Sequence, residues 1–298
     1  MKIFDCFMYF DEDLILDLRL NYLSDYVDYF VIVESRFNHN GEKREPRFDI
    51  NKFKKFKDKI IYLLVNSEGQ NFYKISDQDD KDEILGKNLM NALVRENYQR
   101  NYIVNGLDKA NDEDWIIISD LDEIPNLKSN NIKEIKNKIV FFDQLMIYYK
   151  FNLFLNEFPW IGSKACKKKY LKSPQWLRNI KDRKYPWWRL VILFSEKKFN
   201  NIKIFKNGGW HFSYIKNPDD IEKKLRSYLH HTEYEQNPIG VEKISKLIKE
   251  KKTVYNLKVD SRSNKFEEGN LLQKLDMKLL PEYINKNLDK YSDWIENE

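Results

Sequence analysis

Acidic residues stand at the end of an apolar run in the segment Trp115–Pro125. It reads WIIISDLDEIP, so Asp120 and Asp122, separated by one residue, follow a strand-sized apolar stretch. Two carboxylates at this spacing can converge on one hard divalent cation, because Mg²⁺ and Mn²⁺ prefer oxygen ligands and keep positions open for phosphate oxygens. Such a cation neutralises the charge that develops on a leaving diphosphate. The pattern predicts a metal–diphosphate site.

Two other interpretations fit the same spacing. Asp is common at solvated strand-to-turn junctions, where it has no catalytic role. Aspartyl-phosphate phosphatases also place Asp-x-Asp after an apolar strand and use the first Asp as nucleophile. Their motif usually stands near the start of the domain and is followed by Thr or Gly-Thr. Here about 115 residues precede it and Glu123–Pro125 follows, which disfavours the phosphatase.

A second candidate segment, Asn207–Tyr214, reads NGGWHFSY. Paired glycines allow positive φ and close backbone approach, so we expect a tight turn that holds His211 in a fixed pose. A neutral imidazole can bind the same metal or a phosphate, although a histidine among aromatic residues can equally be structural. Of the 4 histidines in the chain, His211, His230 and His231 lie within about twenty residues of one another.

Short apolar runs alternate with longer helical patterns in the first half, which predicts a layered α/β sheet. A buried strand that ends in acidic residues is where open α/β sheets bind ligands. Strands are predicted over Lys2–Phe7, Tyr29–Val33, Ile60–Val65 and Trp115–Ile118, and helices over Pro46–Lys57, Asp13–Leu23 and Asp82 to about Ala110.

The second half is less regular. We expect β structure over Val140–Leu155 and Arg189–Phe194, and helices over Asp219–Tyr228, Val241–Lys251 and Pro281–Glu296. We find no internal repeat and no low-complexity linker. The chain is therefore predicted to be a single domain, 1–298, with a catalytic, metal-binding half at 1–126 and an acceptor half with C-terminal helices at 127–298.

Composition narrows the class of protein. Aromatic residues make up 15% of the 298 residues, which excludes a disordered chain. With 52 Lys+Arg and 47 Asp+Glu, the net charge of +5 slightly favours an anionic ligand and does not indicate nucleic-acid binding.

The N-terminal residues, the apolar runs and the cysteines indicate in which cellular compartment the protein is expected. No apolar run approaches the roughly 20 residues that cross a bilayer, and Met1–Cys6 does not begin a signal peptide. The 2 cysteines, Cys6 and Cys166, form no disulfide framework. These features predict a cytoplasmic protein without a transmembrane segment.

Several motifs, in order along most of the chain, resemble glycosyltransferase family 17, the family of β-1,4-mannosyl-glycoprotein 4-β-N-acetylglucosaminyltransferases. The ordered set of motifs is more specific for this family than any single motif. The matching segments are Phe4–Phe7, Val31–Ser35, His39–Gly41, Arg95–Arg100, Ile118–Pro125, Gly208–Tyr214 and His231–Glu233.

The resemblance implies a GT-A-like (Rossmann-like) fold with a mixed central sheet flanked by helices, a nucleotide-sugar donor and inverting transfer, usually with Mn²⁺ or else Mg²⁺. It makes Asp120 and Asp122 the metal and diphosphate carboxylates, and His211 a late metal- or phosphate-binding residue. Glu34 falls where such folds begin to hold the nucleotide.

By the same resemblance, Arg95 or Arg100 on the long helix is a candidate to bind the diphosphate. A salt bridge to Glu96 is the alternative for these arginines. The predicted function is metal-dependent transfer of a sugar, GlcNAc by resemblance, from a UDP-sugar to a hydroxyl of a glycan acceptor.

Two alternatives from other classes stay open, a carbohydrate-binding protein on a degenerate transferase fold and a nucleic-acid-binding protein. The sequence shows no signal anchor of the kind found in animal members, so the family's N-glycan acceptor is not carried over.

An inverting transfer needs a carboxylate to take the proton of the acceptor hydroxyl. The sequence offers Glu233, Asp182 and Glu123 for this role, and Glu123 can instead support Asp122. The aromatic residues of Tyr148–Trp160, with Trp176 and Trp187-Trp188, can stack on sugar rings, although most of them are expected in the core. The basic run Lys164–Lys172 is expected to be a solvated face.

Overall fold

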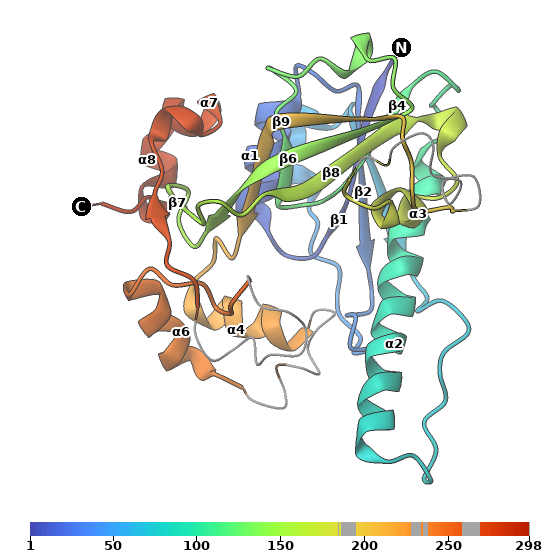
Figure 1. Cartoon of the computed structure of the whole chain (residues 1–298), viewed down its shortest axis with the longest axis vertical. Coiled ribbons are helices and arrows are strands. Elements are labelled where there is room, and N and C mark those ends of the chain that lie inside the picture. The colour runs from blue at the N-terminus through green and yellow to red at the C-terminus, as the bar shows by residue number, and fades with distance from the viewer. Residues whose placement is uncertain (184, 186–194, 228–233, 235–237, 258–268, 298) are drawn as a thin grey trace.

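The computed structural model describes residues 1–183, 185, 195–227, 234, 238–257 and 269–297. In these residues one large sheet of ten strands is flanked by helices (Figure 1). The strand order is β10-β7-β6-β8-β4-β1-β2-β3, and β9 pairs with both β6 and β5. The strands are β1 Ile3–Tyr9, β2 Tyr29–Ser35, β3 Ile60–Val65, β4 Trp115–Asp120, β5 Glu123–Pro125, β6 Ile139–Tyr148, β7 Leu153–Phe154, β8 Trp160–Lys167, β9 Ile202–Ser213 and β10 Gln273–Lys274.

Strands β3, β2, β1 and β4 are parallel to one another. Their mostly apolar residues suit a parallel sheet covered by helices on both faces, and β3 at the edge is half-buried. From β1 the chain proceeds to β2 and β3 on one side and then returns to place β4 on the other side of β1. The carboxyl ends of β1 and β4 therefore form a topological switch point, where such sheets leave a crevice for a ligand.

The rest of the sheet is antiparallel except for one pair. Strand β8 runs antiparallel to both β4 and β6, while β9 runs parallel to β6 and antiparallel to β5. The fold is thus mixed α/β with a mixed central sheet flanked by helices, as predicted. The division into a metal-binding half and an acceptor half stays a prediction.

Three groups of helices pack against the sheet. On one face, α1, α7 and α8 share a core with residues such as Trp115 and Ile117 of β4. On the other face, α3 and the chain just after α2 pack on Ile116 and Ile118, because neighbouring residues of a strand face opposite sides. Helices α4 and α6 pack together beside β6 (Figure 1). The bounds are α1 Asp13–Leu23, α2 Lys81–Asn101, α3 Pro174–Asn179, α4 Pro218–Ser227, α6 Gly240–Lys249, α7 Glu282–Lys286 and α8 Leu288–Tyr291.

Most predicted elements are present, and α1 and β3 have the predicted bounds. The tight turn expected at Gly208–His211 is wrong, since these residues continue β9 across an irregularity in its pairing with β6. The predicted helix Pro46–Lys57 is also wrong in its first part. There the backbone N–H groups of Arg47 and Phe48 donate to Glu34, and only Ile50–Phe56 coils, as a 3₁₀ helix.

The C-terminal helix expected over Pro281–Glu296 is broken in two. Asn287, with φ −132° and ψ 41°, separates α7 from α8. The predicted strand Arg189–Phe194 lies outside the described residues. No helix in the described ranges is both long and apolar enough to cross a bilayer.

The basic run Lys164–Lys172, which begins within β8 and continues past it, is not solvated on every side. Lys164 is buried and donates to the carbonyl oxygens of Arg178 and Ile180 at the end of α3. Lys168 likewise donates to two carbonyl oxygens, those of Leu107 and Ala110. These lysines satisfy backbone carbonyls and so fix neighbouring segments, α3 among them.

Gly209 permits the close contact between β9 and β5. Its φ is +141°, and an added Cβ would stand 2.1 Å from the carbonyl oxygen of Ile124. We expect Gly209→Ala to lower the free energy of unfolding by about 2 kcal/mol or more, through backbone strain and overlap. Urea unfolding followed by circular dichroism measures this change.

Gly86 is the matched control, because it lies inside α2 with no atom within 4 Å of the added Cβ. Gly86→Ala should raise the free energy of unfolding by about 0.5–1 kcal/mol. Equal effects of the two substitutions would contradict the assigned role of Gly209.

Candidate functional site

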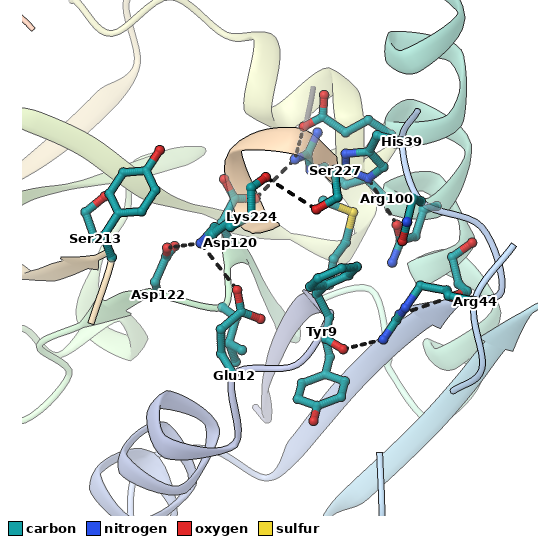
Figure 2. Close-up of a pocket in the computed structure, with 18 of the residues that line it drawn as sticks. Tyr9, Glu12, His39, Arg44, Arg100, Asp120, Asp122, Ser213, Lys224 and Ser227 are labelled. Carbon is teal, nitrogen blue, oxygen red and sulfur yellow. Dashed lines mark hydrogen bonds and ion pairs between the residues drawn. The ribbon is translucent and has the colours of Figure 1, made fainter. Parts of the chain in front are cut away.

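The carboxyl ends of β1, β2 and β4 open into a cavity of about 270 Å³ (Figure 2). Met8 of β1 pairs with Asp120 of β4, and Tyr9 pairs with Glu34 of β2, so the three strands end at one level. The cavity is therefore at the switch point. The described residues that line it include Glu12, Ser35, His39, Arg100, Asp120, Asp122, His211, Ser213, Lys224 and Tyr255.

Pairing of β5 with β9 brings Asp122 and His211 together. Glu123 stands opposite His211 in the register, and the backbone N–H of Phe212 donates to the Asp122 carbonyl oxygen at 2.8 Å. As a result, Nε2 of His211 lies 3.6 Å from Oδ1 of Asp122. The two residues are 89 positions apart by number (211 − 122), and only this strand pairing makes them neighbours.

The Asp122 carboxylate also faces an ammonium group. Nζ of Lys224 lies 3.4 Å from Oδ2 of Asp122 and 3.3 Å from Oε1 of Glu12 (Figure 2). Burial works to raise the pKa of Asp122, but Lys224 and His211 outweigh it and the pKa is lowered. The pKa of Glu12 is lowered in the same way, against burial, by Lys224 and Lys216. Both carboxylates are thus ionised at neutral pH.

His211 is buried between Asp122 and an aromatic ring. Its ring centroid lies 4.8 Å from that of Trp160, and the ring planes are tilted by 30°. Burial works to lower the pKa of His211, but the Asp122 carboxylate outweighs it and the pKa is raised. Nδ1 of this ring is buried and has no hydrogen-bond partner among the described residues.

Asp120 faces a different environment from Asp122. Its carboxylate oxygens lie 3.1 Å from Nη2 of Arg100 and 3.0 Å from Nη2 of Arg178. Alternation along β4 explains this, because even-numbered residues of the strand face α2 and α3, which carry the two arginines. Burial works to raise the pKa of Asp120, but Arg178 and Arg100 lower it. The carboxylate is neutralised by two guanidinium groups.

The chain turns from β4 to β5 over residues 120–123, the acidic turn, and Glu123 at its end is completely buried. Its carboxylate accepts hydrogen bonds from Nη1 and Nη2 of Arg178 at 2.7 and 3.1 Å, and from Nε1 of Trp160 at 2.9 Å. It also accepts the backbone N–H of Asp120 at 2.9 Å. With its oxygens used in this way, Glu123 holds Arg178 and the turn in position.

Arg19 of α1 holds the same turn from the opposite face. Nη1 donates to the carbonyl oxygens of Asp120, Leu121 and Glu123 at 3.1, 3.0 and 2.7 Å. Nε and Nη2 donate to the two carboxylate oxygens of Asp5 at 2.8 and 2.6 Å. One buried guanidinium therefore satisfies three backbone carbonyls and is itself neutralised by β1.

A sequence model described as glycosyltransferase family 17 matches residues 1–295, which is nearly the whole chain. The chain belongs to glycosyltransferase family 17. It is therefore a glycosyltransferase, which acts on a sugar donor and an acceptor. Membership favours glycosyl transfer over the phosphatase and nucleic-acid interpretations.

Other comparisons add little. No curated protein matches the chain. Among solved structures, HddC from Yersinia pseudotuberculosis is similar over 72% of this chain and 91% of its own, with 10% sequence identity and a TM-score of 0.32.

Two residues predicted to bind the donor have other contacts in this family 17 enzyme. The buried Glu34 accepts the backbone N–H groups of Arg47 and Phe48 and the Tyr62 hydroxyl, and so fixes the segment after β2. Arg95 pairs with Glu68 at 2.7 Å. Neither Glu34 nor Arg95 is among the described residues that line the cavity.

Arg100 does line the cavity, and it also forms the salt bridge to Glu96 that was the alternative, at 2.7 Å. Asp182, a candidate base, pairs with Lys164 at 2.6 Å and is not among the described lining residues. Glu233, His230, His231 and Trp187-Trp188 lie outside the described residues. Among the aromatic candidates, Tyr148 and Phe151 are in the core.

Sequence reasoning missed Glu12, Arg178 and Lys224. The position of Glu12 could have identified it, since it directly precedes the helix after the first strand, at the edge of the sheet where ligands bind. Arg178 follows Trp176 within a short helix and carries no motif. Lys224 is one of several charged residues on an amphipathic helix, which by itself indicates a solvated face.

The predicted metal residues do not all converge. Asp122 and His211 are adjacent, whereas Asp120 faces the arginines. Within the described ranges, no three or more His, Cys, Asp or Glu side chains form a group that could hold a metal ion.

Removing Arg19 should leave the Asp5 carboxylate buried without a counter-charge. We expect Arg19→Met to lower the free energy of unfolding by about 3–5 kcal/mol. The double variant Asp5→Asn/Arg19→Met should regain part of this loss, because no buried charge remains, but not all of it, because three carbonyls lack their donor. Urea unfolding of the three proteins tests both statements. A double variant no more stable than Arg19→Met would refute the charge argument.

The two cavity histidines should affect stability with opposite pH dependence. The pKa of His211 is raised, so its contribution is complete below the unfolded value of about 6.5 and is lost as pH rises through the folded value. Burial lowers the pKa of His39, so its contribution is present above about 6.5 and is lost as pH falls.

Urea unfolding between about pH 5.5 and 9 measures this difference. The stability lost in His211→Asn should shrink as pH rises, whereas the stability lost in His39→Asn should grow. Parallel pH profiles for the two variants would show that the charges around His211 are assigned wrongly.

Proposed function

We propose that this family 17 enzyme is a metal-dependent, inverting glycosyltransferase that moves a sugar from a UDP-sugar to a hydroxyl of a glycan acceptor. GlcNAc is the proposed sugar on the family resemblance. The observation that carries the proposal is the Asp122–His211 pair, 3.6 Å apart in a cavity at the switch point of the sheet. Ligands of doubly wound sheets bind at this position.

The residues present fit Mn²⁺ or Mg²⁺. Asp122 supplies an ionised carboxylate, and His211 supplies an imidazole whose Nε2 lies 3.6 Å from that carboxylate. A mixed oxygen and nitrogen donor set suits Mn²⁺, which leaves several positions for diphosphate oxygens and water. When bound, the ion would neutralise charge on the leaving diphosphate. Asp120 is a weaker candidate ligand because two arginines already bind it.

The other end of the cavity suits the nucleoside. Phe10 and Phe37 line it with flat apolar side chains, and Asn38 and His39 add polar groups. Oδ1 of Asn38 is buried with no partner among the described residues, so it is available as an acceptor for a base N–H. Aromatic surfaces with a few placed polar groups are typical of small-molecule sites.

The identity of the catalytic base, which takes the proton of the acceptor, stays a prediction. An inverting enzyme takes the proton from the acceptor hydroxyl as that oxygen attacks the anomeric carbon. The contacts of Glu123 favour its alternative, supporting role, since its oxygens accept hydrogen bonds from Arg178, Trp160 and the backbone of Asp120. Asp182 and Glu233 remain candidates.

The decisive test is calorimetric binding of UDP with and without Mn²⁺. Asp122→Asn keeps the size of the side chain and removes its charge. We expect UDP affinity measured in Mn²⁺ to fall by about thirtyfold, or about 2 kcal/mol, because one ligand of the ion loses its charge.

Asp143→Asn is the matched control, because Asp143 pairs with the exposed Lys206 away from this cavity. It should bind UDP as the wild type does. UDP binding that needs no metal, and that Asp122→Asn leaves unchanged, would overturn the proposed site. Hydrolysis of a panel of UDP-sugars, followed by release of UDP, would then identify the donor sugar.

A further inference from the structure

Helix α4 presents one lysine to the cavity. Ile221 and Leu225 are buried against the core beside β6, which fixes the rotation of the helix. Lys224 lines the cavity, whereas its neighbour Lys223 faces solvent. The helix therefore positions the Lys224 ammonium next to Asp122, from the opposite side of the cavity to β1 (Figure 2).

The contacts of Lys224 are longer than those of a tight ion pair. Its Nζ lies 3.3 Å from Glu12 and 3.4 Å from Asp122, whereas charge-assisted N–H···O bonds are usually about 2.7–2.9 Å. A lysine ammonium has three donors on a flexible stem, so it can turn toward a new acceptor. The side chain is also 24% exposed, which leaves it accessible from the cavity.

Other cations of the cavity are held more tightly. Arg44 donates to the carbonyl oxygens of Phe10 and Ser35 and pairs with Glu34 at 3.1 Å. Arg100 pairs with Glu96 at 2.7 Å and with Asp120 at 3.1 Å. Among the described cations that line the cavity, Lys224 is thus the one whose charge can move to an anion beside Asp122.

We propose that Lys224 binds the diphosphate of the donor, which makes α4 part of the donor site. This inference rests on the proposed function. In the free enzyme the ammonium lies between Glu12 and Asp122, and on binding it donates to diphosphate oxygens. A divalent ion at Asp122 and His211 would meet the same diphosphate, so the two cations share its charge.

The role in transfer follows from the charge. The bond between the anomeric carbon and the diphosphate oxygen breaks, and its electron pair stays on that oxygen. The acceptor oxygen forms the new bond to the anomeric carbon and loses its proton to the enzyme's base. Lys224 keeps its protons and stabilises the departing UDP by charge and hydrogen bonds.

The test is calorimetric binding of UDP, inorganic diphosphate and uridine in EDTA and in Mn²⁺. We compare the wild type, Lys224→Met, Lys224→Arg and the matched control Lys223→Met. In Mn²⁺, Lys224→Met should bind UDP and diphosphate at least about tenfold more weakly and bind uridine normally. Lys224→Arg should recover most of the UDP affinity, and Lys223→Met should match the wild type.

The outcomes separate this inference from the proposed function. Equal UDP affinity of the wild type and Lys224→Met in Mn²⁺ overturns the role of Lys224 and leaves the donor class standing. Equal loss of uridine and UDP affinity also overturns it, because Lys224 would then act through the fold. A wild type that binds no UDP, with or without Mn²⁺, overturns the donor class and the role of Lys224 together.

Discussion

The guanidinium of Arg19 lies between β1 and the acidic turn that follows β4. Its charge pairs with Asp5, and its planar set of N–H groups donates to the carbonyl groups of the turn. The turn directs three carbonyl groups toward α1, away from the sheet ladder, and each would be costly to bury without a donor. A planar group with five N–H donors can satisfy them together while Asp5 neutralises its charge. First strand, first helix and acidic turn are thereby joined into one rigid unit.

Because Arg19 fixes its carbonyl groups, the turn directs its two aspartate side chains into two different environments. Asp120 faces the arginines of α2 and α3, whereas Asp122 faces His211 and Lys224 across the cavity. Residues of the same type, two positions apart, therefore have different partners. Asp120 is held by two guanidinium groups, whereas Asp122 has an ammonium and an imidazole beside it and is the carboxylate that the proposed metal ion would share.

The second half of the chain completes the site through a strand and a helix. Strand β9 pairs with the short β5 and so supplies His211, and Gly209 permits the close approach of the two backbones. Helix α4 supplies Lys224 from the cluster beside β6. A cavity at a switch point, lined from both halves, suits the proposed donor, whose anomeric carbon is attacked by the acceptor while its diphosphate leaves.

The sequence by itself determined the strands and helices of the parallel sheet, the acidic strand end, the Gly-Gly-Trp-His segment and the family, because these follow from local periodicity and from motifs. It did not determine that Gly208–His211 continues a strand, that Arg100 and Arg178 converge on Asp120, or that Glu12 and Lys224 meet at Asp122. Those facts depend on strand pairing and helix packing between segments far apart in the chain. Only the tertiary structure decides which charges meet, because the charge alternation of a helix such as α4 is the same whether it faces water or a cavity.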